Sequence, residues 1–218
     1  MIRFFSTLSS LLLIILFLIF KNRNKEKKLW VIFFYILLSF LFDLSFFTIG
    51  EAFNIPEFYL YVCFTLTEYT IFSIFFYLTY QRKAFKWLVV SCYPGFLAIT
   101  YYLLANSKNY SFDSLTASFE GIFIIIFSIL FFYEQLTHPE VTFIYASKYF
   151  WIIVAMLIYL SATLFLFIAA TYLSLNDFER LSIINGIANI TKNILIAIAF
   201  IIPTTKLIRH SSGKSYNM

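Results

Sequence analysis

Seven long apolar runs constrain this chain more than any other feature of its sequence. A helix needs about 20 residues to cross the roughly 30 Å of hydrocarbon in a bilayer. The runs lie at about residues 4–20, 29–49, 58–80, 87–105, 115–133, 149–174 and 183–203. Because every connection is short, successive helices are predicted to be antiparallel neighbours in one bundle. The predicted fold is therefore all-α, a polytopic membrane protein with a single seven-helix domain over residues 1–218.

Composition supports a membrane location. Hydrophobic residues make up 61% of the 218 residues and charged residues only 12%, whereas a soluble domain needs far more polar surface. The first run is predicted to be a retained helix rather than a signal peptide. Its only preceding charge is Arg3, and no small-residue cleavage site follows it.

Basic residues are distributed unequally between the two sides of the predicted bundle. Twelve fall on one side: Lys21, Arg23, Lys25, Lys27, Lys28, Arg82, Lys83, Lys86, Lys148, Lys206, Arg209 and Lys214. Only Arg3, Lys108 and Arg180 fall on the other side. Cytoplasmic loops carry an excess of Lys and Arg, so we expect the N-terminus outside and the C-terminus in the cytoplasm, in a cell inner membrane. The basic segments favour contact with the lipid bilayer, and nucleic-acid binding is not supported.

Four ionisable residues lie inside the apolar runs, where each costs about 2.5–3.5 kcal/mol to insert. They are Asp43, Glu68, Glu120 and Lys192. Lys192 is predicted to point into the bundle and pair with Glu68, which lies at matching depth, with Asp43 as the second choice. One lysine can pair with only one of the three acids, so carboxylates remain without a partner inside the runs. This favours a functional cavity. Purely structural pairing between helices remains the alternative.

Further polar side chains extend this pattern. Ser182, Asn185, Asn189 and Lys192 follow a 3-4-3 spacing, which places them on one face of the last helix. Tyr159 and Thr163 share a face of the sixth helix in the same way. All these groups fall in the centre or the outer half of the predicted membrane. The pattern predicts one polar pocket that opens outward and is closed inward, with the two asparagines as its hydrogen-bonding rim.

The sequence shows no catalytic or metal-binding motif. Its only histidines, His138 and His210, and its only cysteines, Cys63 and Cys92, are too few and too scattered for a zinc site. No serine- or metalloprotease signature occurs. Glu134, near a loop bend, is interpreted as part of a capped helix end. We therefore expect neither an enzyme nor a metal.

A lysine in the seventh helix resembles the retinal-binding rhodopsins, whose chromophore is an imine of such a lysine. Ala188 stands where those proteins carry an acid, one turn before Lys192. The sixth run also lacks the proline of their chromophore pocket. No cofactor is therefore expected, and a retinal-type or lipid-active membrane protein is only a third hypothesis.

Three segments resemble a family of small bacterial seven-helix membrane proteins. They are residues 66–70 (LTEYT), 119–136 (FEGIFIIIFSILFFYEQL) and 149–167 (YFWIIVAMLIYLSATLFLF). These proteins look similar to the membrane-embedded sensor modules of two-component histidine kinases. The resemblance implies a sensory bundle without an attached kinase, with Glu68 and Glu120 as its functional acids.

The leading hypothesis is therefore a receptor-like or sensory membrane protein. Its outward-facing pocket would bind a small ligand, a lipid or a proton, and a cytoplasmic partner would respond. The alternative is a small solute transporter or proton-coupled channel that uses the same residues. Pro94 and Gly95 interrupt the fourth run as in some carriers. However, a carrier needs an inward-open state, and the wholly apolar inner half of the last helix is not suited to line one.

Overall fold

The computed structural model describes residues 2–53, 57–106, 114–137, 143–169 and 175–203. These described residues form α-helices and two short 3-10 helices, with no strand, which confirms the all-α fold class. The helices are α1 (Ile2–Ile19), α2 (Lys27–Phe53), α3 (Glu57–Thr79), α4 (Lys83–Asn106), α5 (Ser114–Thr137), α6 (Lys148–Ala169) and α7 (Leu175–Ile201). The 3-10 helices are η1 (Lys21–Arg23) and η2 (Ile144–Ala146).

Five helices, α3 to α7, are long and apolar enough to cross a membrane, and α1 adds a shorter apolar stretch at Phe4–Ile19. The chain thus has the features of a multi-pass membrane protein. Several helices extend beyond the predicted runs, and α7 begins at Leu175 rather than near residue 183. Hydropathy identifies only the part of a helix that lipid would cover. The helices are longer than the predicted runs because their backbone hydrogen bonds continue into the polar residues on either side.

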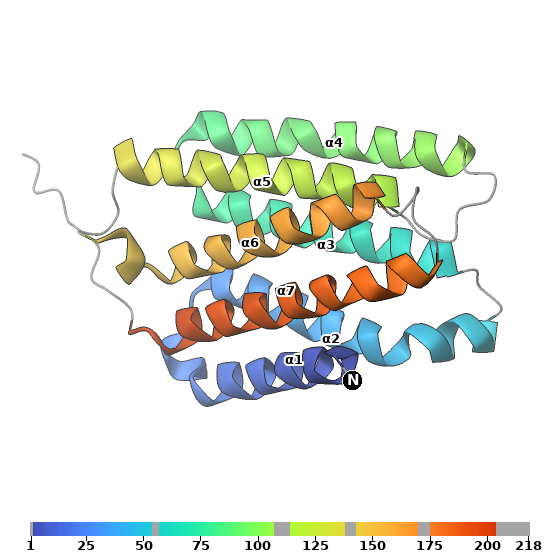
Figure 1. Cartoon of the computed structure of the whole chain (residues 1–218). Coiled ribbons are helices and arrows are strands. Elements are labelled where there is room, and N and C mark those ends of the chain that lie inside the picture. Colours follow the sequence, from blue (N-terminus) through green and yellow to red (C-terminus); the bar gives the residue numbers. More distant parts are fainter. Residues whose placement is uncertain (1, 54–56, 107–113, 138–142, 170–174, 204–218) are drawn as a thin grey trace, which may run out of the picture.

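Six helices form a closed circle, and α4 lies outside it. Going round, α1 packs on α2, α2 on α3, α3 on α5, α5 on α6, α6 on α7, and α7 again on α1. Helix α4 packs mainly on α3 and α5, and Figure 1 shows it at the edge of the bundle opposite α1. The middle of the circle is therefore lined by every helix except α4.

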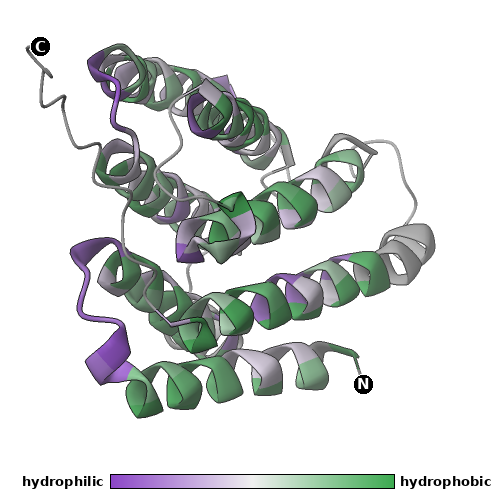
Figure 2. Cartoon of the chain, turned by 90° about the vertical axis from the view of Figure 1, so that its left-hand side faces the viewer, coloured by the Kyte–Doolittle hydropathy of each residue, from purple (hydrophilic) through white to green (hydrophobic). Residues whose placement is uncertain are grey.

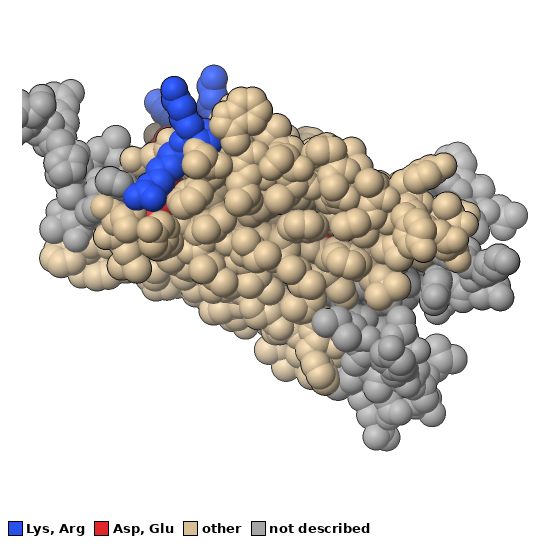
Figure 3. Space-filling model, turned by 90° about the horizontal axis from the view of Figure 1, so that it is seen from above, with Lys and Arg blue, Asp and Glu red and all other residues tan. Residues whose placement is uncertain are grey.

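The surface of the bundle is apolar along its length and basic at one end. Large apolar side chains such as Phe34, Ile129 and Phe165 are exposed, and Figure 2 shows that apolar residues make up most of the length of the helices. Lys and Arg gather at one end in Figure 3. We call this the basic end. The side chains there are Lys21, Arg23, Lys25, Lys27, Lys28, Arg82, Lys83 and Lys86.

The half of the core nearest the basic end is filled by aromatic rings. The phenylalanines that line it, each no more than 1% exposed, are Phe17, Phe72, Phe75, Phe76, Phe127, Phe131 and Phe200. Edge contacts join them across helices, as between Phe17 and Phe200 and between Phe76 and Phe127. We call this set the aromatic layer. Its rings close the space between the helices on the basic side.

A buried asparagine ties three elements together at the basic end. Asn24 follows η1, and its side-chain amide donates to the carbonyl of Phe200 at 3.2 Å, near the end of α7. Its Oδ1 accepts from Lys148 Nζ at 2.7 Å, and the same ammonium donates to the carbonyl of Arg23 at 2.9 Å. We call Asn24, Lys148 and Phe200 the basic-end clamp. It satisfies a helix-end carbonyl that would otherwise lack a partner.

Glu134, near the end of α5, caps a different helix. Its carboxylate is fully buried and accepts the backbone N–H of Arg82 at 2.6 Å and of Gln81 at 3.2 Å. Both donors immediately precede α4, where a negative charge also favours the helix dipole. His138 and Glu140, its sequence neighbours, lie outside the described residues.

Replacing Glu134 tests this cap. Glu134→Ala removes the acceptor of the Gln81 and Arg82 N–H groups, so we expect a loss of about 1–2 kcal/mol in the free energy of unfolding. Glu134→Gln keeps one acceptor oxygen and should lose markedly less. Denaturant titration of the detergent-solubilised protein measures both. Equal losses for the two variants would contradict the capping role.

Candidate functional site

Two hydrogen bonds in series link a lysine to a glutamate in the middle of the bundle. Lys192 Nζ on α7 donates to the hydroxyl of Tyr35 on α2 at 2.7 Å. That hydroxyl donates in turn to Glu68 Oε1 on α3 at 2.8 Å. The three side chains are 3%, 2% and 7% exposed, respectively. We call this arrangement the central chain, and hydrogen bonds of this charge-assisted kind are among the strong ones in proteins.

The prediction of a direct ion pair between Lys192 and Glu68 is corrected, because the Tyr35 hydroxyl lies between them. The structure brings both residues to one place, but a phenol stands between them, because a hydroxyl can accept from the ammonium while it donates to the carboxylate. Sequence reasoning missed Tyr35 because it is one of sixteen tyrosines in an aromatic-rich chain. Its depth in the predicted membrane could have identified Tyr35, because it lies about as far along α2 from the basic end as Lys192 does along α7.

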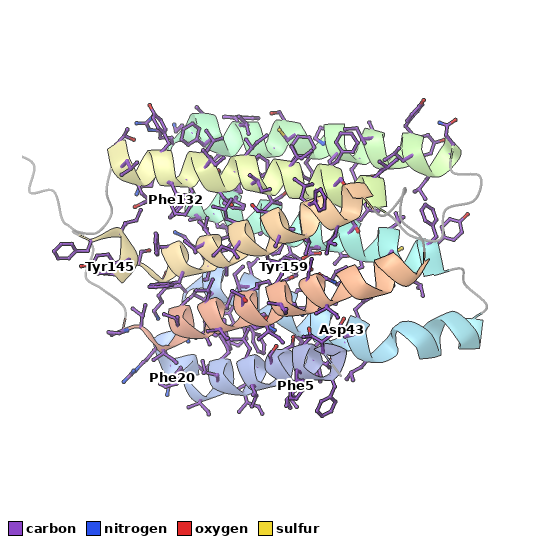
Figure 4. All side chains as sticks on the ribbon, viewed as in Figure 1. Phe5, Phe20, Asp43, Phe132, Tyr145 and Tyr159 are labelled. Atoms are coloured by element: carbon purple, nitrogen blue, oxygen red, sulfur yellow. The ribbon has the colours of Figure 1, made fainter. Side chains whose placement is uncertain are left out.

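Two aromatic rings enclose the Lys192 ammonium. Its Nζ lies 4.9 Å from the ring centroid of Tyr35 and 4.3 Å from that of Tyr159 on α6. Figure 4 labels Tyr159, midway along the bundle between α6 and α7. The face of the Tyr159 ring attracts the cation electrostatically, whereas Tyr35 meets the cation through its hydroxyl. Thr163 is buried on the same helix, but its hydroxyl donates to the carbonyl of Tyr159 one turn earlier, within α6.

Two further carboxylates lie within electrostatic reach of the central chain. Asp43 on α2 interacts with Lys192 and Glu68 and is exposed. Figure 4 shows it on the side of Tyr159 away from the basic end. Glu120 on α5 is 3% exposed and interacts with both Tyr35 and Tyr159. Of the four ionisable residues predicted from the sequence, Lys192 and Glu68 are thus joined through Tyr35, Asp43 lies within range of both, and Glu120 lies within range of the two tyrosines.

Asn189, one of the two asparagines predicted to form the pocket rim, contacts α1 instead. Asn189 Nδ2 donates to Ser6 Oγ on α1 at 2.6 Å, so this amide faces α1 while Lys192 reaches α2. Asn185 is exposed. A Cβ at Gly186 would lie 2.7 Å from Ile2 Cγ1, which shows how closely α1 and α7 approach. Small and polar residues permit such close helix packing in membranes.

A second amide repeats this contact one turn further along α7. Asn193 Nδ2 donates to Ser9 Oγ at 2.7 Å and to Ser10 Oγ at 3.0 Å. Sequence reasoning missed the serines of α1 because they are small and not ionisable. Their recurrence at positions 6, 9 and 10, within an otherwise apolar run, was the available signal.

The central chain predicts that loss of the Tyr35 hydroxyl group lowers the free energy of unfolding by an unusually large amount. Tyr35→Phe removes the shared hydroxyl from two buried charged groups, so the free energy of unfolding should fall by about 2–3 kcal/mol. Tyr93→Phe is the matched control, because its hydroxyl bonds only the neutral Thr70 hydroxyl at 3.0 Å. It should lose about 1 kcal/mol or less. Denaturant titration in detergent compares them, and equal losses would refute a charge-assisted chain.

Comparison with protein-family models, with curated proteins and with solved structures finds no match for this chain. The resemblance to sensor modules of histidine kinases therefore stays a prediction. Within the described part of the chain, no three His, Cys, Asp or Glu side chains are grouped so that they could hold a metal ion. What the site does has to be argued from its own contacts and charges.

Proposed function

We propose that this chain is a sensory integral membrane protein of a cell inner membrane. In this proposal all seven helices cross the bilayer, the N-terminus lies outside and the basic end lies in the cytoplasm. The excess of Lys and Arg at one end supports this orientation. Trp30, Trp87 and Trp151 lie in the first turns of α2, α4 and α6, at that same end, where tryptophan favours the membrane–water interface.

The observation that carries the sensory proposal is the charge of the central region. Glu68 is joined to Lys192 through Tyr35, and Asp43 lies within electrostatic range of both residues. Pairing two helices needs only one acid and one base. A buried carboxyl group at Glu68, with a second acid in range at the exposed Asp43, favours uptake of a proton or of a cationic ligand. We propose that this uptake is the sensed event.

The contacts of the Lys192 ammonium also suggest how a change at the site would be transmitted to the basic end. Lys192 belongs to α7, its ring partner Tyr159 to α6, and its hydrogen-bond partner Tyr35 to α2. Helices α6 and α7 meet again in the basic-end clamp, through Lys148 and Phe200, and Asn24, which joins them there, lies three residues before α2. A shift of Lys192 would therefore reach the clamp through rigid helices. A cytoplasmic partner would detect the change there.

A carrier or channel is the second hypothesis, and the aromatic layer argues against it. A carrier has to open toward the cytoplasm, but the rings of Phe17, Phe76, Phe127 and Phe200 fill that half of the bundle. A retinal-type protein is less favoured still. Ala188, one turn before Lys192, stands where such a protein would carry an acid, and Lys192 Nζ already donates a hydrogen bond to the Tyr35 hydroxyl. We propose no enzymatic activity.

Cysteine labelling tests the proposed topology. With Cys63 and Cys92 replaced by Ser, Lys108→Cys should react with a membrane-impermeant maleimide in intact cells. Lys25→Cys should react only after permeabilisation, because the basic end is proposed to face the cytoplasm. Labelling yield on a gel is the measurement. Reaction of Lys25→Cys in intact cells would reverse the orientation.

Tryptophan fluorescence tests transmission to the basic end. In a Trp87→Phe background only Trp30 and Trp151 emit, at the starts of α2 and α6. Lys192→Met removes the cation from Tyr35 and Tyr159, so we expect their emission maximum to shift although neither tryptophan is altered. Ile194→Met, on the exposed face of the same helix, is the control and should leave the spectrum unchanged. Identical spectra for the two variants would contradict the route.

A further inference from the structure

The central chain can hold its protons in two arrangements. In the charged form, Lys192 Nζ donates to the Tyr35 hydroxyl at 2.7 Å, and this hydroxyl donates to Glu68 Oε1 at 2.8 Å. When one proton moves from Nζ to the Tyr35 oxygen and the phenol's own proton moves to Oε1, the ends become a neutral amine and a neutral carboxyl group. Both hydrogen bonds persist with donor and acceptor exchanged, because an amine, a hydroxyl and a carboxyl group can each donate or accept. No proton enters or leaves the protein, so the shift needs no cavity or water-filled path.

Burial brings the two forms close in free energy. The three side chains are no more than 7% exposed, and separated charges are costly away from water, which favours the neutral form. The charge-assisted hydrogen bonds and the Tyr159 ring, 4.3 Å from Nζ, favour the charged form. Asp43 attracts the ammonium and repels the carboxylate, so its effects on the two ends oppose each other. We therefore expect the populations of the two forms to lie within a factor of about ten of each other.

We infer that the central chain is a proton relay, in which Tyr35 passes a proton between Lys192 and Glu68. This inference rests on the proposed sensory function and assigns Lys192 as the source of the proton that Glu68 takes up. In the neutral form, Lys192 loses its electrostatic attraction to the Tyr159 ring, so the contact between α7 and α6 weakens. A change in the spacing of α2, α3 and α7 alters the two hydrogen bonds, and α6 responds.

The test measures both ends of the chain in the purified protein, reconstituted in phosphatidylcholine bilayers. Infrared difference spectra between the wild type and Glu68→Gln isolate the C=O stretch of a protonated Glu68. Glu134→Gln removes another buried carboxylate and, as the matched control, should leave this band in place. Nitrogen NMR of lysine Nζ, compared with Lys192→Arg, isolates the Lys192 amine. We expect equal populations of protonated Glu68 and neutral Lys192, which change by the same factor with temperature, because one proton is shared between the two ends.

Tyr35→Phe separates a relay from a spacer. Without the phenol proton, the two populations should no longer change together. Equal and coupled populations in this variant would make Tyr35 a spacer only and overturn the relay. A wild-type protein with a fully charged pair, or with a protonated Glu68 beside an ammonium, overturns it as well.

The outcomes also separate the relay from the proposed function. If the relay is overturned but Lys192→Met still shifts the tryptophan spectrum, the sensory route survives without it. Coupled populations with an unchanged tryptophan spectrum support the relay and remove the sensory route. Should the variants fail to fold, the wild-type spectra decide: amine and protonated-carboxyl signals that rise and fall together support the relay, and the absence of a neutral amine overturns it.

Discussion

The packing around the centre of this protein depends on how one ammonium group is kept stable away from water. Inserting a lysine at mid-membrane costs about 2.5–3.5 kcal/mol on insertion scales. A hydrogen bond to a charged group returns about 1.5–3 kcal/mol, and a desolvated cation–π contact about 2 kcal/mol. Lys192 makes both kinds of contact, with Tyr35 and Tyr159, so the cost is roughly offset. Because the two tyrosines belong to α2 and α6, the same compensation fixes where those helices lie relative to α7.

Buried polar groups in this bundle fall into two kinds. Glu134 and Asn24 bond mainly to backbone groups at helix ends, which cannot change partners without unwinding a helix. The central chain joins side chains only, each held by rotatable bonds. Such contacts can exchange one partner for another while every helix stays intact. This difference, more than burial or charge alone, separates a place suited to switching from places that only hold the fold together.

The sequence predicted the helices well and the site in part. Apolar runs of membrane-spanning length specify helices, but helix ends such as Leu175 lie in polar flanks that hydropathy does not mark. Lys192 and Glu68 stood out because ionisable residues are rare in apolar runs. Tyr35 did not, since tyrosine is common in this chain and its hydroxyl has a role only through neighbours on other helices. The same applies to Ser6, whose partner lies more than 180 residues away.

The contact between α1 and α7 joins the first and last helices of the chain, which has a consequence for biosynthesis. In the proposed topology α1 enters the bilayer long before Asn189 and Asn193 have been translated. Ser9 and Ser10 meanwhile donate to the carbonyl of Ser6 within α1, at 2.6 and 3.4 Å, so the early helix carries no costly unsatisfied hydroxyl there. The amides of α7 then find these same oxygens as acceptors. Closure of the helix circle is thus deferred to the end of synthesis, and a chain that stopped before α7 would expose one side of α1 and of α6 together.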